Sequence, residues 1–152
     1  MSESNRIVFE NVKFGQVSVD PASVVTFPRG LPGFEALRRF GWVQIEEEAP
    51  FVRLLSIEDS RVGFVLLAPA LVWPEYAPVI GDEDLLALGI QRVEQVGLYC
   101  IITLSADPAR VTANLKGPIC VNLETMQARQ LILVDDRYHT KHPLMGEGRQ
   151  AP

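Results

Sequence analysis

Apolar and polar residues alternate along much of this chain, and prolines and glycines break the alternation at short intervals. The alternation runs from Arg6 to Val12 through Ile7 and Phe9, whereas the strand expected from Phe51 to Ile57 carries large apolar groups on both faces. Successive side chains of a strand point to opposite faces of a sheet, so this pattern predicts β-strands with a buried face. Proline lacks a backbone N–H and glycine permits positive φ, so the 11 prolines and 11 glycines place turns between short strands.

The expected architecture is therefore mostly β: an antiparallel, partly open β-barrel or sandwich with one or two short helices. One helix is expected at Phe34 to Phe40, where Leu37 and Phe40 lie three apart. A second is expected from Asp82-Glu83-Asp84, which supplies a cap and first-turn acids, to a stop at Gly89. Strands are expected at residues 6–12, 17–19, 24–27, 42–46, 51–57, 62–67, 96–104 (the longest), 111–113, 119–122 and 130–134.

One loop is restricted more tightly than the others. Two prolines and two glycines within six residues, from Pro28 to Gly33, leave few backbone conformations. We assign five residues mainly to the shape of this loop: Phe27, Pro28, Gly30, Pro32 and Gly33.

The chain has the length of a single domain, expected at residues 1–145, followed by a polar and flexible C-terminal tail at residues 146–152. Its start lacks the pattern of a secretory signal, and the apolar stretch from Gly97 to Leu104 is too short to span a membrane. Cys100 and Cys120 lie in apolar, strand-like runs, where buried free thiols are expected. These features favour a cytoplasmic protein.

The charge balance argues against nucleic acid as a direct partner. The formal net charge is −5 and the sequence pI is about 5.0. Nucleic acid binding usually needs a basic face that neutralises phosphates, whereas the basic residues here are scattered, with Arg38-Arg39 the densest pair. An acidic surface fits a basic protein partner instead.

Signals for catalysis and for metal or cofactor binding are weak. On a helix, Asp135, His139 and His142 would share one face and form a metal set, but they follow a strand and Pro143 ends the stretch, so we interpret them as turn residues. The acids at 46–48 precede Ala-Pro and are interpreted as a solvated turn. No nucleophile elbow or phosphate-binding glycine loop is present. We expect no enzyme activity, no metal and no cofactor.

Residues 70–79 form an aromatic segment stiffened by proline. Trp73 and Tyr76 lie in it, next to Pro74 and Pro78. Rigid aromatics on a preordered loop are good interface anchors, because little entropy is lost on binding. They are equally suited to capping the protein's own core. The sequence leaves both interpretations open.

Several stretches, taken in order, resemble the FliW family of flagellar assembly factors. The resemblance covers roughly residues 6–144 and is most specific where a Phe-Pro-x-Gly-x-Pro-Gly-Phe-Glu loop is followed downstream by Asn-Leu-Lys-x-Pro. The matching stretches are residues 14–15, 25–35, 51–56, 62–65, 74–76, 111–122 and 129–133. The chain departs from the family at Arg29, often Glu, at Leu55, often Gln, and at Gly117, often Ala.

The resemblance implies a binding protein with two partners, flagellin and the translational regulator CsrA. In this scheme flagellin and CsrA compete for FliW, and FliW freed by flagellin export relieves the repression that CsrA exerts on flagellin translation. The alternatives are an RNA-binding β-barrel and a metal-dependent hydrolase using His139 and His142. An exposed strand edge would also suit a partner peptide that adds to it as a strand.

The residues expected to contact partners are mainly polar side chains, several of them close to strand ends, together with three aromatics. They are Ser56, Glu58, Asp59, Phe64, Trp73, Tyr76, Asn114, Lys116 and Asn122.

Overall fold

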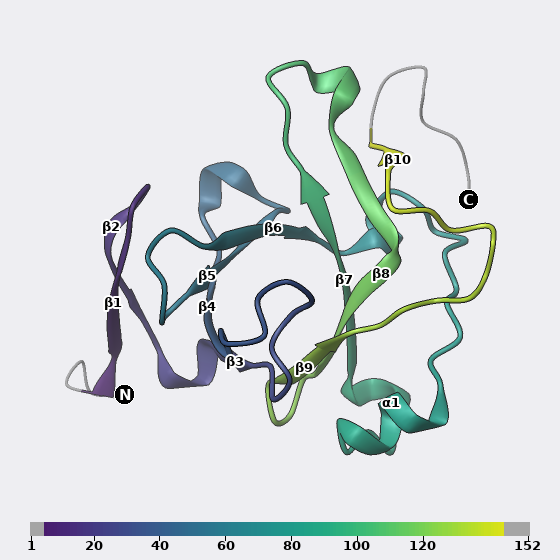
Figure 1. The fold of residues 1–152 in the computed structure, drawn as a ribbon, viewed down its shortest axis with the longest axis horizontal. Coiled ribbons are helices and arrows are strands. Elements are labelled where there is room, and N and C mark those ends of the chain that lie inside the picture. Colours follow the sequence, from purple (N-terminus) through teal and green to yellow (C-terminus); the bar gives the residue numbers. More distant parts are fainter. Residues whose placement is uncertain (1–4, 145–152) are drawn as a thin grey trace.

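The computed structural model of the protein describes residues 5–144 (Figure 1). Within these residues the fold is almost entirely β, with one short α-helix, α1 (Asp82–Ala87). The strands are β1 (Ile7–Asn11), β2 (Gly15–Val19), β3 (Val24–Thr26), β4 (Arg39–Val43), β5 (Val52–Ser56), β6 (Gly63–Leu67), β7 (Val96–Thr103), β8 (Thr112–Asn122), β9 (Gln127–Gln130) and β10 (His142–Pro143).

Seven of the strands close into a barrel. Neighbouring strands follow the order β8-β7-β6-β5-β4-β3-β9, and β9 pairs back onto β8. Every pairing in this ring is antiparallel except β3–β9, which is parallel and consists of the single pair Thr26 and Gln127. The mostly β barrel expected from the sequence is thus confirmed, with one parallel contact completing the ring. The hairpin β1–β2 forms a separate sheet, and β10 adds two residues to the outer edge of β8.

The core has three parts. The barrel interior holds the first cluster, in which Phe27 and Phe40 meet edge to face at 5.4 Å between ring centroids. The outer face of β7 and β8 holds the second and largest cluster, covered by the segments before and after α1 and by residues 131–144. The β1–β2 hairpin packs Phe9, Val17 and Val19 against Leu55 in the third. Apolar burial on both faces of the barrel strands provides the main stabilisation.

The helix predicted at residues 34–40 does not form. A succession of turns takes its place: Phe34 donates its N–H to the carbonyl of Leu31, and Leu37 donates to Phe34. Strand β4 then begins at Arg39 and carries Phe40, fully buried, into the barrel interior. The three-residue spacing of Leu37 and Phe40 was a local signal, and packing of Phe40 inside the barrel outweighs it.

The two strands predicted at 111–113 and 119–122 are one continuous strand. β8 has 11 residues, so it exceeds β7 and is the longest strand within residues 5–144. Pro118 lies inside it, opposite Leu131, whose N–H donates to the Pro118 carbonyl at 2.8 Å. Proline cannot return that hydrogen bond. Strand β9 therefore ends at Gln130, and residues 131–134, predicted as strand, run beside β8 without a regular ladder.

The second predicted helix is confirmed as α1. The three acids occupy its first turn as predicted, but the N-cap residue is Gly81 and no side chain caps the helix, so the predicted cap was wrong. The carboxylate of Asp84 instead pairs with Arg129 at 2.7 Å. Gly89 follows the helix at a φ of 65°, as its predicted stop requires. The predicted tail at 146–152 lies outside the described residues. No helix in residues 5–144 is long and apolar enough to cross a membrane.

Candidate interaction surface

Trp73 and Tyr76 belong to the core. Trp73 is 1% exposed and Tyr76 is 9% exposed, and both pack in the largest cluster. The Tyr76 hydroxyl donates to the carbonyl of Leu115 at 2.7 Å, and its ring meets Tyr138 edge to face at 4.7 Å. The expectation that these two rings are available at the surface is therefore corrected. The bond to Leu115 fastens Tyr76 to β8.

Three predicted contact residues shape turns instead of facing solvent. The Ser56 hydroxyl accepts hydrogen bonds from the N–H groups of Glu58 and Asp59. Asn114 Oδ1 likewise accepts hydrogen bonds from the backbone N–H groups of Lys116 and Gly117. Asn122 is 1% exposed, accepts from residues 124 and 125, and donates to the Leu88 carbonyl at 2.8 Å. These side chains satisfy backbone groups that the turns leave unpaired.

Glu58 and Asp59 lie at the surface but are engaged. Glu58 Oε1 accepts from the N–H groups of Arg38 at 2.6 Å and Arg39 at 3.0 Å, and these bonds hold the pKa of Glu58 below its ordinary value. The hydrogen bond and ion pair with Arg61 likewise lower the pKa of Asp59. Glu58 thus fixes the start of β4 from a distant loop.

Phe64 and Lys116 are half-buried. Phe64 packs edge to face with the exposed ring of Phe34 at 5.5 Å and also contacts Phe40 at 6.1 Å. Lys116 lies near Asp135, whose pKa is lowered first by its hydrogen bond from Arg137 and to a lesser degree by the charge of Lys116. Of the predicted contact residues, these two keep side-chain surface with no hydrogen bond or ion pair within residues 5–144.

The histidines form a small packed unit. His142 is 8% exposed, and its Nε2 accepts from the N–H of His139 at 2.8 Å, with the two rings stacked at 5.3 Å. Asp135, the third member of the metal set considered above, is paired with Arg137. In the part of the chain that the structure describes, no group of three or more His, Cys, Asp or Glu side chains is placed to hold a metal ion.

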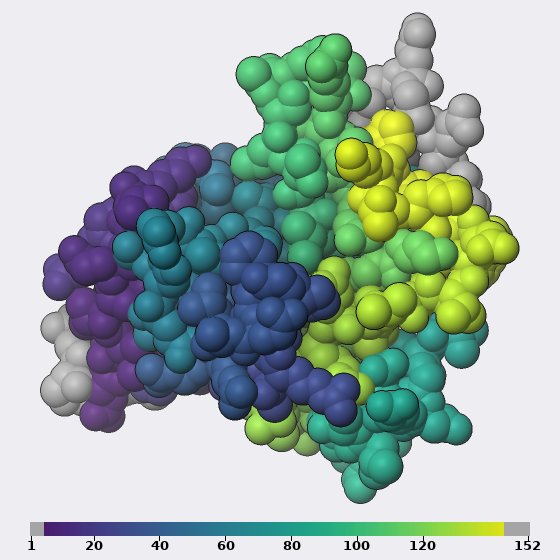
Figure 2. Space-filling model, in the orientation of Figure 1, coloured from purple at the N-terminus to yellow at the C-terminus, as the bar shows by residue number. Residues whose placement is uncertain are grey.

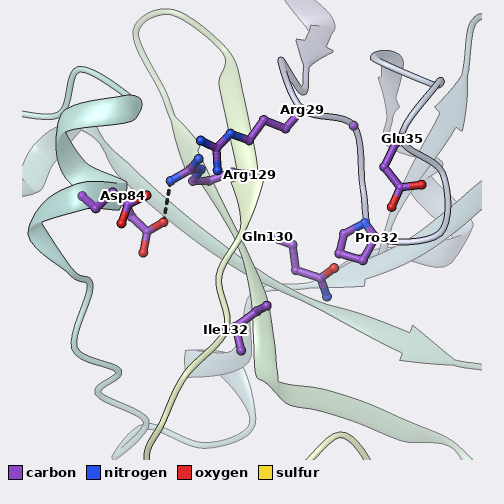
Figure 3. Close-up of a pocket in the computed structure, with 9 residues that line it drawn as sticks. Arg29, Pro32, Glu35, Asp84, Arg129, Gln130 and Ile132 are labelled. Atoms are coloured by element: carbon purple, nitrogen blue, oxygen red, sulfur yellow. Dashed lines mark hydrogen bonds and ion pairs between the residues drawn. The ribbon is translucent and has the colours of Figure 1, made fainter.

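The loop after β3 is held in one conformation by its glycines. Gly30 has a φ of 67°, and a Cβ there would lie 2.6 Å from the backbone of Glu35. Gly33 has a φ of 86° in open space, and its N–H donates to the Glu35 carboxylate. Phe27 is fully buried under the loop. Pro28 lies between Phe27 and Gly30, and Pro32 lies between Gly30 and Gly33. Pro32 also lines an adjacent pocket (Figure 3).

That pocket, of about 360 Å³, lies where the loop, α1 and the end of β9 meet. Figure 3 shows Arg29 reaching from the loop toward Arg129, with Asp84 paired to Arg129 and with Gln130 and Ile132 along the strand. On the surface the same three segments adjoin on one face of the molecule (Figure 2). Sequence analysis missed Arg129, Gln130 and Ile132 as site residues. No alternation in the sequence marked them, because residues 131–134 are all apolar and the fold decides which of them face solvent.

Comparison with known proteins now decides the family. The model of the family described as FliW protein matches residues 8–144. The chain belongs to the FliW family. A flagellar assembly factor FliW from Thermotoga neapolitana is 37% identical over 142 residues, covering 93% of this chain and 95% of its own. The FliW of Symbiobacterium thermophilum is 41% identical over 131 residues, covering 86% and 95%.

A solved structure supports the same assignment. The crystal structure of a flagellar assembly factor FliW superposes with a TM-score of 0.85 at 33% identity, covering 92% of this chain and 98% of that one. The FliW fold is therefore shared over most of this chain.

Proposed function

We propose that this FliW-family chain is a cytoplasmic binding protein that holds flagellin and, when released from it, a CsrA-type translational regulator. The observation that carries the proposal is the family match over residues 8–144, whose relatives are named flagellar assembly factors. Because only one partner is held at a time, the ratio of free flagellin to regulator sets how much regulator is captured. Mass action between two complexes performs this switch, and no bond needs to be made or broken.

The charge of the molecule favours this proposal over direct RNA binding. A net charge of −5 repels phosphate backbones, and an acidic protein can instead capture a basic RNA-binding protein. The proposal also requires no catalytic or metal-binding role for the histidines. His139 and His142 contact each other, and the His142 ring also contacts Trp73.

Affinity capture from flagellated cells tests the proposal. The tagged chain is expected to recover flagellin and the CsrA-type regulator, identified by mass spectrometry, in complexes that size-exclusion chromatography separates. Recovery of neither protein contradicts the proposal. A low-salt gel shift with RNA and metal analysis of the purified protein address the two alternatives: RNA retained by the protein alone supports an RNA-binding barrel, and stoichiometric metal supports a hydrolase.

A further inference from the structure

Residues 130–134 continue from β9 as a segment that lies along β8, and the edge of this segment that faces away from β8 is uncovered. Leu131 and Leu133 donate their N–H groups to the carbonyls of Pro118 and Lys116, at 2.8 and 3.0 Å, so these alternate residues face β8. The backbone groups of Ile132 and Val134 point to the opposite side, because direction alternates along an extended chain. Within residues 5–144 neither of them takes part in a backbone hydrogen bond.

The barrel does not cover this edge. Within residues 5–144 the only pair between β3 and β9 joins Thr26 to Gln127, and just after β3 the chain enters a turn in which Gly30 donates its N–H to the Phe27 carbonyl at 2.8 Å. The chain after β3 therefore turns away from β9 just where the edge becomes free. Natural proteins rarely leave such an edge open beside apolar side chains, since it pairs readily with another chain. Here Ile132 is 79% exposed and Val134 is 93% exposed.

The pocket of Figure 3 runs along this edge. Its walls include Arg129 and Gln130, whose side chains leave opposite faces of the strand, as well as Ile132 further along. A cavity lined from both faces lies beside the backbone itself. The Gln130 side chain is held back by its bond to the Gly117 carbonyl at 2.8 Å, so it leaves the edge accessible.

The charged residues at one end of the pocket indicate which side chain a bound segment would place there. The guanidinium groups of Arg29 and Arg129 point toward one another, and Asp84 supplies one carboxylate, 2.7 Å from Arg129. Within residues 5–144, Arg29 has no hydrogen bond or ion pair. Glu35, the acid on the loop side, is occupied by the N–H of Gly33, and Glu83 lies exposed on α1. The pocket lining carries two cations and three acids, and within residues 5–144 Arg29 is the cation that no acid pairs, so a carboxylate of the occupant can pair with it.

We propose that an extended segment of a partner protein adds as a strand to residues 130–134, placing an acidic side chain against Arg29 and an aliphatic side chain against Ile132. Backbone hydrogen bonds to Ile132 and Val134 give affinity, and the Arg29 contact gives selectivity. The inference rests on the proposed function, because the segment belongs to flagellin or to the CsrA-type regulator.

Three substitutions test the groove. Arg29→Glu reverses the selective charge and weakens binding of the partner that uses the groove by on the order of tenfold. Ile132→Pro removes an edge N–H that has no partner within the described residues, and it also weakens that complex by about tenfold. Arg110→Glu, an equal charge change at a residue outside the pocket, leaves both affinities within about twofold. Unfolding curves of each variant confirm that the barrel is intact.

Isothermal titration with purified flagellin and regulator, followed by hydrogen exchange of the complexes, provides the measurement. The expected result is protection of the Ile132 and Val134 amides by one partner, with affinity restored in Arg29→Glu by an acid-to-Lys change in the protected segment. If a partner binds but these amides stay unprotected and the variants bind normally, the groove is wrong and the proposed function stands. If neither partner binds, both fail. Concentration-dependent pairing of the chain with itself through this edge also overturns the groove.

Discussion

The hydroxyl of Tyr76 donates a hydrogen bond to the backbone carbonyl of Leu115 at 2.7 Å, which fastens the loop before α1 onto β8. The ring is 9% exposed, and burial raises the pKa of Tyr76 well above its ordinary value. Tyr76, which the sequence suggested as a partner contact, therefore stabilises the fold.

Tyr76→Phe is expected to destabilise the protein by about 1–2 kcal/mol, because the Leu115 carbonyl loses its donor in a buried site. Urea unfolding gives the difference. Tyr99→Phe is the matched control: its ring is half-buried and its hydroxyl has no hydrogen bond in the described part of the chain, so the change is expected to stay within about 0.5 kcal/mol. A stable Tyr76→Phe with lost partner binding would reverse this interpretation.

Asn122 and Asn114 offer a comparison of the same substitution. Asn122 donates through Nδ2 to the Leu88 carbonyl, whereas the Asn114 side chain, within residues 5–144, only accepts hydrogen bonds. Asn122→Asp replaces that donor with a buried carboxylate facing a carbonyl and is expected to cost about 3 kcal/mol. Asn114→Asp keeps its acceptor and is expected to cost less than about 1 kcal/mol. Equal losses in thermal unfolding would contradict these roles.

Alanine substitutions at Gly30 and Gly33 distinguish the cost of backbone strain from the cost of a steric clash. Both have positive φ, but a Cβ at Gly30 meets the Glu35 backbone at 2.6 Å and one at Gly33 meets nothing within 4 Å. Gly30→Ala is expected to cost about 3 kcal/mol or more, and Gly33→Ala about 1 kcal/mol. Chemical unfolding of the two variants tests the difference, and a Gly30→Ala protein as stable as Gly33→Ala would show that the loop can move away.

Stability is expected to fall as the pH drops below neutral because of His142. Burial, assisted by the charge of His139, lowers the pKa of His142 from its ordinary 6.5. The neutral ring is the folded form, and its Nε2 accepts the His139 N–H, which a protonated ring cannot do. The unfolded chain therefore binds this proton more tightly. The stabilisation is complete above about pH 6.5 and is lost as the pH falls through the folded-state pKa.

Unfolding free energies measured between pH 7.5 and 5 give this dependence. His142→Gln can still accept the His139 N–H and is expected to flatten the curve, whereas His139→Gln retains most of the slope, since burial is the larger cause. A slope unchanged in His142→Gln would assign the effect to another group.

Local signals in the sequence predicted local structure well. The acids before Leu85 and the stop at Gly89 specify α1 within a few residues, and the loop glycines specify the turn after β3. The helix predicted from Phe34 to Phe40 does not form because contacts with residues far away in the sequence determine this segment. Phe40 packs inside the barrel, and the Glu58 carboxylate accepts hydrogen bonds from the N–H groups of residues 38 and 39.

Closure of the barrel and the pocket could not be read from the sequence. Thr26 and Gln127 are far apart along the chain, and their pairing depends on how all the intervening strands curve. Arg29 and Arg129 meet only because of that closure. Burial of Trp73 was likewise undecidable, since an aromatic loop suits an interface and a core equally.

The central claim is that one molecule exchanges between two partners. Fluorescence anisotropy of labelled regulator, bound to this protein and titrated with flagellin, measures the exchange directly. The account predicts full displacement, with an apparent dissociation constant for the regulator that rises in proportion to flagellin concentration. A ternary complex, in which the anisotropy stays high or increases as flagellin is added, would contradict it.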